Sequence, residues 1–360
     1  INTPNAKGLS NNIHNSFDIP TRGAIDNNSA TITYSQLEKG FIEGNPNLTS
    51  GREASTILHQ IIGGSRSQMN GLLEVAGKKA QLVIVNENGI TCNGCGFINT
   101  SRATLSTGAA NINASGELAG FDVTRGDILI NGMGLDAVSG NQASDQIDLI
   151  ARTVAIRDAT KLRAKQLNVI TGSNSVDYVG LAHGEIAGSG AVPEVALDVA
   201  ALGGMYADYI RLIATDDGVG VNMNGAAASA GNLTLDANGK ISFGAASKVS
   251  SGAETMITTT EDFEGAGSVK SAGDLSVTAK NITNDGVLNS GASVSLEAQE
   301  QITSGKTAMI RSESDTSLKA GTGIENNGVV AAYGNLDIDA PDIRNDGGIL
   351  WANDNVTIGS

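Results

Sequence analysis

The sequence predicts an all-β protein built as a right-handed parallel β-helix, a solenoid in which short strands stack coil upon coil. Three observations predict it: the composition, a strand-like alternation of apolar and polar residues, and a repeat of about 20 residues. The 360 residues include 46 Gly, only 5 Pro and 3% aromatic residues. This composition suits many short strands joined by tight turns better than the core of a compact enzyme.

The repeat is clearest in the last third of the chain. Short alternating segments recur there, and their leading hydrophobic residues lie about 20 residues apart, from Leu275 to Val294 and from Leu336 to Val356. Pairs such as Asn238-Gly239 and Asp285-Gly286 separate the segments and are typical of tight turns. A unit this short cannot bury a core alone, so each unit must stack on the next.

The first third is less regular and is predicted to contain an N-terminal cap. We expect an amphipathic or irregular insertion at Ser55 to Gly77, because the end of a solenoid needs a cover. The apolar residues available for this cover are Ile57, Leu58, Ile61, Ile62, Leu72 and Leu73. At the other end, Asn355 to Ser360 stops within the repeat without a capping sequence. The natural chain is therefore expected to continue.

The net charge of the chain limits the partners that it can bind. The formal net charge is −15, which opposes binding to phosphate backbones and to anionic membrane surfaces. No apolar run approaches the roughly 20 residues of a spanning helix. We expect a monomer that neither binds nucleic acid nor inserts into a membrane. The chain opens at Ile1 without a basic and apolar leader, which is compatible with export after removal of a signal peptide.

Two asparagine turns stand out. Asn45-Pro46-Asn47-Leu48 has Asn at the first position, Pro at the second and Asn at the third, which favours a type I turn. Asn86-Glu87-Asn88-Gly89-Ile90 has the same frame, with Glu in place of Pro. Taken alone, each motif is only a turn. Together they become candidate site residues through the resemblance described below.

The two cysteines leave a disulfide open. Cys92 and Cys95 would face opposite sides of a straight strand, but the intervening Asn93-Gly94 favours a tight turn that brings them together. A redox pair would need a helix N-terminus, and the flanking sequence favours strands. A zinc site lacks a second ligand pair, since His14, His59 and His183 are scattered. We predict no catalytic, metal or cofactor site and no enzyme activity.

The chain resembles a known family over about 240 residues. The segment from Gln81 to Thr100, with the two asparagine turns, closely resembles the secretion domain of two-partner secretion exoproteins, namely filamentous haemagglutinins, large haemolysins and contact-dependent inhibition proteins. The first turn matches the family motif without change, and the second departs from it at Glu87. Further matching segments are Asp148–Arg152, Asn168–Gly172, Val176–Tyr178, Ala201–Ala207 and Ile210–Leu212.

The resemblance implies a function. The chain would be the secretion and folding-initiation module of a large bacterial exoprotein, with a capped β-helix and small extra-helical β elements. Its partner would be the periplasmic domains of an outer-membrane transporter, and it would be secreted or held at the cell surface. We expect residues 1–230 to form the secretion domain and residues 231–360 to continue the shaft. The alternatives are an adhesin segment that binds ligands through the β-helix, and a carbohydrate-active β-helix enzyme.

Overall fold

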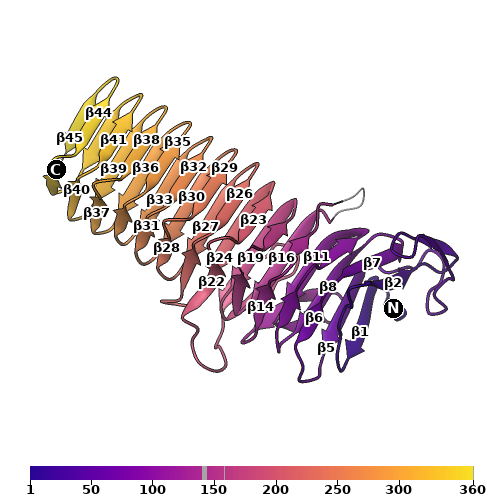
Figure 1. Ribbon diagram of the computed structural model, residues 1–360. Helices are drawn as coiled ribbons and strands as arrows, with labels where there is room; N and C mark the ends of the chain where they lie inside the picture. The colour runs from indigo at the N-terminus through magenta and orange to yellow at the C-terminus, as the bar shows by residue number, and fades with distance from the viewer. Residues whose placement is uncertain (140–143, 158, 360) are drawn as a thin grey trace. The chain divides into compact units, whose positions relative to one another are not determined.

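The computed structural model describes residues 1–139, 144–157 and 159–359. These residues form 45 strands and no helix. No helix of membrane-spanning length and hydrophobicity is therefore present in the described parts of the chain. The chain divides into two compact units, Ile1–Pro193 and Glu194–Ser360. In each unit the strands form parallel sheets, with successive coils contributing one strand to each sheet (Figure 1).

Unit 1 begins with a complete coil. Its first strand, β1, opens the first sheet; Ile19 bridges to Met69 in the second sheet; and β2 opens the third. The first sheet of this unit contains β1 (Leu9–His14), β5 (Thr56–Ile61), β8 (Ala80–Asn86), β11 (Thr100–Ser106), β16 (Gln146–Ala151) and β19 (Gln166–Thr171). The second contains β6 (Ser67–Met69), β9 (Ile90–Cys92), β14 (Asp127–Ile130) and β17 (Thr153–Ile156). The third face holds β2 (Ala24–Asn28), β7 (Leu72–Gly77) and β10 (Gly96–Ile98), then β15 (Leu135–Asp136) and β18 (Lys161–Arg163).

Unit 2 repeats this arrangement more regularly. Its first sheet contains β24 (Tyr209–Ala214), β27 (Leu233–Ala237), β30 (Thr255–Thr259), β33 (Leu275–Ala279), β36 (Val294–Ala298), β39 (Thr316–Ala320), β42 (Leu336–Asp339) and β45 (Val356–Gly359). The second contains β22 (Val195–Val199), β25 (Gly220–Met223), β28 (Ile241–Phe243), β31 (Phe263–Gly265), β34 (Ile282–Asn284), β37 (Gln301–Ser304), β40 (Gly323–Asn326) and β43 (Asp342–Arg344). The third contains β23 (Gly204–Ala207), β26 (Ala226–Ser229), β29 (Lys248–Ser251), β32 (Ser268–Ser271), β35 (Val287–Ser290), β38 (Met309–Ser312), β41 (Val329–Ala332) and β44 (Ile349–Ala352).

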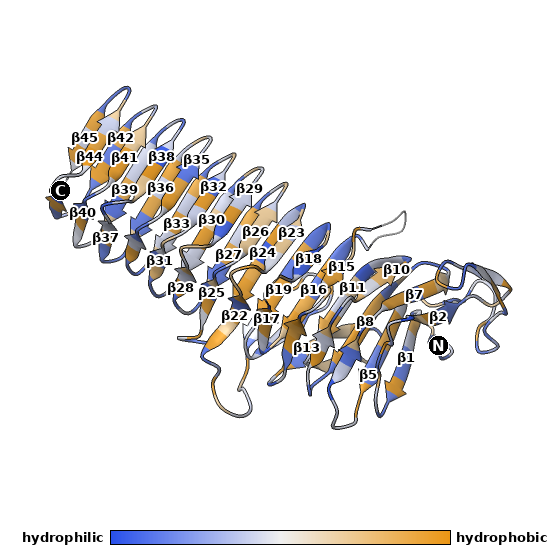
Figure 2. Ribbon diagram, in the orientation of Figure 1, coloured by the Kyte–Doolittle hydropathy of each residue, from blue (hydrophilic) through white to orange (hydrophobic). Residues whose placement is uncertain are grey.

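The register of unit 2 confirms the predicted repeat. Leu275 pairs with Val294, and Leu336 pairs with Val356, in neighbouring parallel strands. One repeat is thus one coil. Along strands such as β33 and β36 the buried residues are apolar and the outward residues are more polar, an alternation that Figure 2 shows as bands of orange and blue. The all-β parallel β-helix predicted from the sequence is confirmed.

A ladder of serines lines one corner of unit 2. Ser229, Ser251, Ser271, Ser290 and Ser312 stand in register on five successive strands, and all are buried. Their hydroxyl groups donate to nearby backbone carbonyls, as Ser229 does to Gly231 O at 2.7 Å and Ser290 to Gly273 O at 2.7 Å. A buried polar group is stable only when it has such a partner. The abundant serine therefore has a structural use at the bends of the coil.

The segment Ser55 to Gly77 is not the predicted insertion. It contributes β5, β6 and β7, which pair in parallel with β8, β9 and β10. Ile57, Leu58 and Leu73 are therefore ordinary core residues. The prediction was wrong because β5 and β7 bury consecutive residues, so the alternation that identifies a half-buried strand is lost there.

Polar residues cover the N-terminal side of the first coil. The side chain of Asn12 accepts from Asn2 N at 2.8 Å, and Ser10 Oγ donates to Asn2 O at 2.7 Å. Asn2 Nδ2 also donates to Asn11 O at 2.9 Å. Residues 1–3 thus lie along β1 and satisfy its polar groups, an arrangement that protects the first strand with hydrogen bonds.

Small β elements lie outside the coils of unit 1, as predicted. A hairpin is formed by β3 (Thr33–Ser35) and β4 (Gly40–Ile42). A four-stranded antiparallel sheet contains β12 (Ala109–Ile112), β13 (Leu118–Val123), β20 (Asn174–Asp177) and β21 (His183–Glu185). Both elements interrupt the coil pattern between parallel strands.

Candidate functional site

The first asparagine turn is closed by its own side chain. Leu48 N donates to Asn45 O at 3.0 Å, which completes a four-residue turn. Asn47 N donates to Asn45 Oδ1 at 3.0 Å, so the side chain of Asn45 holds the turn from inside. The amide Nδ2 of the buried Asn45 donates to Ile1 O and Asn27 O, both at 3.0 Å. One side chain therefore shapes the turn and fastens it to two other segments.

The second asparagine turn repeats this bonding. Gly89 N donates to Asn86 O at 3.0 Å, and Asn88 N donates to Asn86 Oδ1 at 2.9 Å. Asn86 is fully buried, and its Nδ2 donates to Ser65 O at 2.9 Å and to Ser67 Oγ at 3.0 Å in the preceding coil. The two motifs thus have the same hydrogen-bonding pattern: the side chain of each leading asparagine closes its turn and bonds the turn to a segment that precedes it in the sequence.

The third residue of each motif adds a bond to the same earlier segment. Asn47 Nδ2 donates to Ile1 O at 3.1 Å, and Asn88 Nδ2 donates to Gly63 O at 2.7 Å. The second positions face outward, where Pro46 is exposed and Glu87 is half-buried. Because Glu87 lies near the surface, its replacement of Pro disturbs no packing. It pairs instead with Arg125 at 3.4 Å.

Glycine is required at position 89 because of its backbone conformation and the close approach of neighbouring atoms. Its φ of 101° lies in the left-handed region, and a Cβ there would come within 2.6 Å of Arg66 Nη1. Arg66 binds both carboxylate oxygens of Asp127 at 2.7 and 2.8 Å, and its Nη2 donates to Ile90 O at 2.9 Å. Arg66 therefore joins the second turn, at Ile90, to Asp127 in the following coil.

Cys92 and Cys95 are joined in a disulfide, with their Cα atoms 5.4 Å apart. Between them Gly94 has a φ of 81°, which permits the tight turn. Both cysteines are buried, and Cys95 N and Gly94 N donate to Gly134 O in the next coil. The bridge fastens one corner of the coil. Within the described residues, no group of His, Cys, Asp and Glu side chains is arranged to hold a metal ion.

Two of the histidines that look scattered in the sequence lie together. His14 Nε2 lies 3.0 Å from His59 Nδ1, and His59 Nε2 lies 2.9 Å from Asp26 Oδ2. Phe17 stacks on the His59 ring at 4.4 Å. Burial, followed by the charge of His59, lowers the pKa of His14. The pairing was missed because it depends on the parallel register of β1 and β5.

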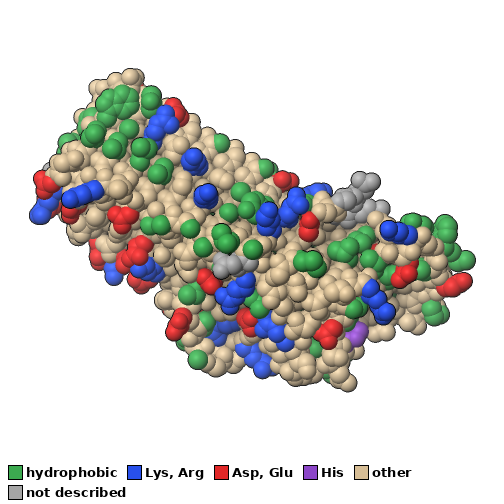
Figure 3. Space-filling model, viewed as in Figure 1, with side chains coloured by type: hydrophobic (Ala, Val, Ile, Leu, Met, Phe, Trp, Pro, Cys, Tyr) green, Lys and Arg blue, Asp and Glu red, His purple; other side chains and the backbone are tan. Residues whose placement is uncertain are grey.

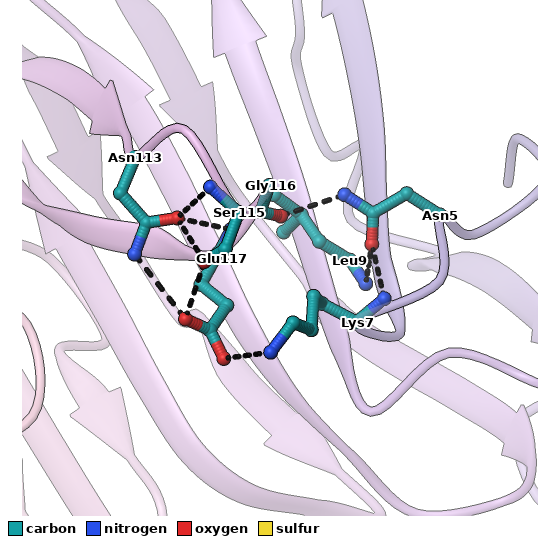
Figure 4. A network of polar contacts seen from close by, with 7 residues as sticks. All are labelled: Asn5, Lys7, Leu9, Asn113, Ser115, Gly116 and Glu117. Carbon is teal, nitrogen blue, oxygen red and sulfur yellow. Dashed lines mark hydrogen bonds and ion pairs between the residues drawn. The ribbon is translucent and has the colours of Figure 1, made fainter.

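A polar network missed by sequence analysis ties the start of the chain to the extra-helical sheet (Figure 4). Asn5 Nδ2 donates to Gly116 O at 2.6 Å, and Lys7 Nζ pairs with Glu117 at 3.2 Å. Hydrogen bonds from Ser115, Asn113 and Lys7 lower the pKa of the Glu117 carboxyl group. The partners are more than 100 residues apart in the sequence, so no local pattern indicates them.

A buried ion pair attaches the extra-helical sheet to the outside of the coils. Arg102 Nε bonds to Asp148 Oδ2, and the guanidinium lies 4.2 Å from the centroid of the Tyr178 ring. Tyr178 donates its hydroxyl hydrogen to Gln81 Oε1 at 2.8 Å, and burial raises the pKa of this hydroxyl. Asp148 and Tyr178 lie in segments that carry the family resemblance. Their contacts here are structural.

Comparisons with known proteins agree with this geometry. The family model described as "TPS secretion domain" matches residues 1–243. The chain is 47% identical over 242 residues to the tRNA nuclease CdiA-2 of Burkholderia pseudomallei (strain 1026b), covering 67% of this chain and 8% of that protein. It is 40% identical over 296 residues to the tRNA nuclease CdiA of Escherichia coli (strain NC101), covering 81% of this chain and 8% of the relative.

A solved structure is similar over most of its length. The crystal structure of the filamentous hemagglutinin secretion domain superposes with a TM-score of 0.61 at 30% identity. The match covers 87% of this chain and 92% of that one. The toxin relatives are therefore matched over less than a tenth of their length, whereas the isolated secretion domain is matched almost completely.

Proposed function

The chain belongs to the TPS secretion domain family, and on this premise we propose that its folded turns start the β-helix of a large exoprotein. As a secretion domain of the CdiA and filamentous haemagglutinin type, it is a non-catalytic module of a protein exported through an outer-membrane transporter. The names of these relatives include a nuclease activity, but this chain matches only 8% of the length of each. We assign none of them to this segment.

The observation that carries the proposal is the shared bonding of the two asparagine turns. Asn45 and Asn86 each bond to chain that precedes them. Each turn is therefore stable only when the earlier segment is already in place. In a parallel solenoid every coil presents its edge to the next, and forming the first stacked coils is the costly nucleus. Residues 1–230 would supply that nucleus, and residues 231–360 would extend it.

Transporter recognition would precede folding. In the folded chain Asn45 and Asn86 are buried and their amide groups are already bonded within the protein. A periplasmic domain would therefore read these segments while they are extended. A strand such as Gln81–Val85 would then pair with an exposed sheet edge of the transporter by β-augmentation.

Secretion with and without the cognate transporter tests the proposal. Cells would express the chain behind a signal peptide, and the amount in the medium would be measured by immunoblot. We expect export only with the transporter, and a strong loss for the double variant Asn47→Ile, Asn88→Ile. A matched control is Asn327→Ile, since Asn327 lies in a turn beyond the family match at residue 243. Transporter-independent export would contradict the proposal, as would an equal loss for the control.

Adhesion is a second candidate, favoured by one observation in unit 2. Tyr333 and Trp351 are both exposed, with ring centroids 5.3 Å apart, and Arg311 lies 5.0 Å from the Tyr333 ring. Exposed aromatic rings beside a cation are common in ligand-binding surfaces. A glycan array probed with the chain and with Trp351→Ala tests this candidate, which fails if both give the same signals.

A further inference from the structure

The hairpin β3–β4 presents one apolar face to solvent. Tyr34 stands directly opposite Phe41 in the antiparallel pair, and their rings meet edge to face at 5.6 Å. Ile32, two residues before Tyr34, lies on the same side of the chain. The exposed fractions are 62% for Ile32, 51% for Tyr34 and 78% for Phe41. Figure 3 shows hydrophobic side chains gathered on the N-terminal loops that contain this hairpin.

The opposite face fixes the hairpin to unit 1. Glu74 of β7 is buried, and its carboxylate accepts from Ser35 Oγ at 2.6 Å, Gln36 N at 2.8 Å and Leu37 N at 3.0 Å. Leu37 also packs over Gly23, where a Cβ would lie 2.7 Å from Leu37 Cδ2. A buried carboxylate with three donors holds its partners firmly. The apolar side chains therefore project from a hairpin whose other face is held by hydrogen bonds to β7.

The size and charge of this face restrict its occupant. The three side chains expose roughly 400 Å² in total, about half of what one partner buries in a specific protein interface. Charged side chains around the hairpin are Glu38, Lys39 and Glu43, which leave little net charge. A small, convex, nearly neutral face of aromatic and aliphatic groups suits a shallow lipid interface, where tyrosine and apolar side chains are favoured.

We propose that this hairpin adsorbs shallowly to a zwitterionic lipid surface. Ile32 and Phe41 enter the boundary of the acyl chains, and the Tyr34 hydroxyl stays at the level of the head groups. The proposal does not depend on how the transporter recognises the chain. Adsorption of one hairpin differs from membrane insertion of the chain, and the net charge of −15 still disfavours anionic lipid.

Co-sedimentation with phosphatidylcholine vesicles tests the proposal on the whole folded chain. We expect the double variant Tyr34→Ser, Phe41→Ser to bind vesicles about tenfold more weakly or worse. The matched control is Met133→Ser, Val192→Ser, which removes two side chains that are 74% and 67% exposed elsewhere in unit 1. It should bind like the wild type. Circular dichroism checks that all variants are folded.

A local probe makes the result specific. Trp351 is the only Trp, so in the variant Phe41→Trp, Trp351→Phe all tryptophan fluorescence comes from the hairpin. Vesicles should shift its emission to the blue, and brominated lipid should quench it. Absence of vesicle binding, binding unchanged in Tyr34→Ser, Phe41→Ser, or binding to anionic vesicles alone would overturn the proposal. A dimer in light scattering that the same double variant abolishes would also overturn it, because the face would then bind a second copy.

Discussion

Replacing Asn86 by Ala should destabilise the second turn severely, because this fully buried side chain takes part in four hydrogen bonds. The change removes the donors to Ser65 O and Ser67 Oγ and the acceptor of Asn88 N and Asn88 Nδ2. At about 0.5–1.5 kcal/mol for each bond, with a further penalty for the buried Ser67 hydroxyl group that loses its donor, the loss is about 3–5 kcal/mol.

Native-state hydrogen exchange is the suitable assay, because a solenoid opens locally and different coils report separately. A local loss of this size should speed exchange of the backbone amides in residues 81–92 by about two to four orders of magnitude. Residues 287–296, in unit 2, serve as the internal reference and should change far less. Asn86→Asp keeps the acceptor but loses both donors and buries a charge, so it should be at least as damaging.

Asn88→Ala is the matched control for this prediction. It removes two bonds, to Gly63 O and to Asn86 Oδ1, from a half-buried side chain, and should lower the free energy of unfolding by only about 1–2 kcal/mol. The reasoning is refuted if Asn86→Ala changes exchange in residues 81–92 by less than tenfold, or if the two alanine variants behave alike. In either case the buried amide would not hold the turn.

Three further predictions follow from buried groups in unit 1. Burial lowers the pKa of His14, so the unfolded chain binds more protons below the ordinary value of 6.5; stability should fall as pH drops through that window, and urea titrations of His14→Gln should show a flatter dependence. Removing the disulfide with Cys92→Ala, Cys95→Ala should lower the free energy of unfolding, relative to the oxidised wild type, by about 2 kcal/mol beyond the packing loss. The difference between the variant and the reduced wild type gives that packing loss. Arg102→Met should cost about 3–5 kcal/mol because it leaves the buried Asp148 carboxylate without its cation. Adding Asp148→Asn, which removes the charge and keeps an oxygen acceptor for Thr104, should restore much of this loss; no recovery in thermal unfolding would contradict the role given to the ion pair.

How far the fold was predictable depends on which faces of a strand are covered. In unit 2 the strand Leu275–Ala279 alternates strictly between buried and half-buried residues, because only its inner face is covered. Its period and register were therefore readable from the sequence. In unit 1, β7 buries four consecutive residues, including Glu74, since the hairpin β3–β4 lies outside it. Alternation disappears there, and the segment was misread as an insertion.

The candidate site was predictable to a similar extent. The turn chemistry of Asn45 and Asn86 follows from local rules, because an asparagine side chain bonds to its own backbone two residues later. The earlier segments that these side chains hold, Ile1, Asn27 and Ser65, depend on the stacking of coils. The contacts of Arg102 with Asp148 and of Lys7 with Glu117 join residues distant in sequence. A single sequence contains no local signal for such pairs.

The bonding of the turns also orders the events proposed for export. Asn86 finds its partners only after residues 63–67 have formed their part of the coil. Lys7 and Asn5 find theirs only once the turn at Asn113–Glu117 exists. The segment before β1 thus gains these bonds from residues that lie more than 100 positions later. Under the proposed function, a segment that has not yet met its partners would still be extended when it passes the transporter.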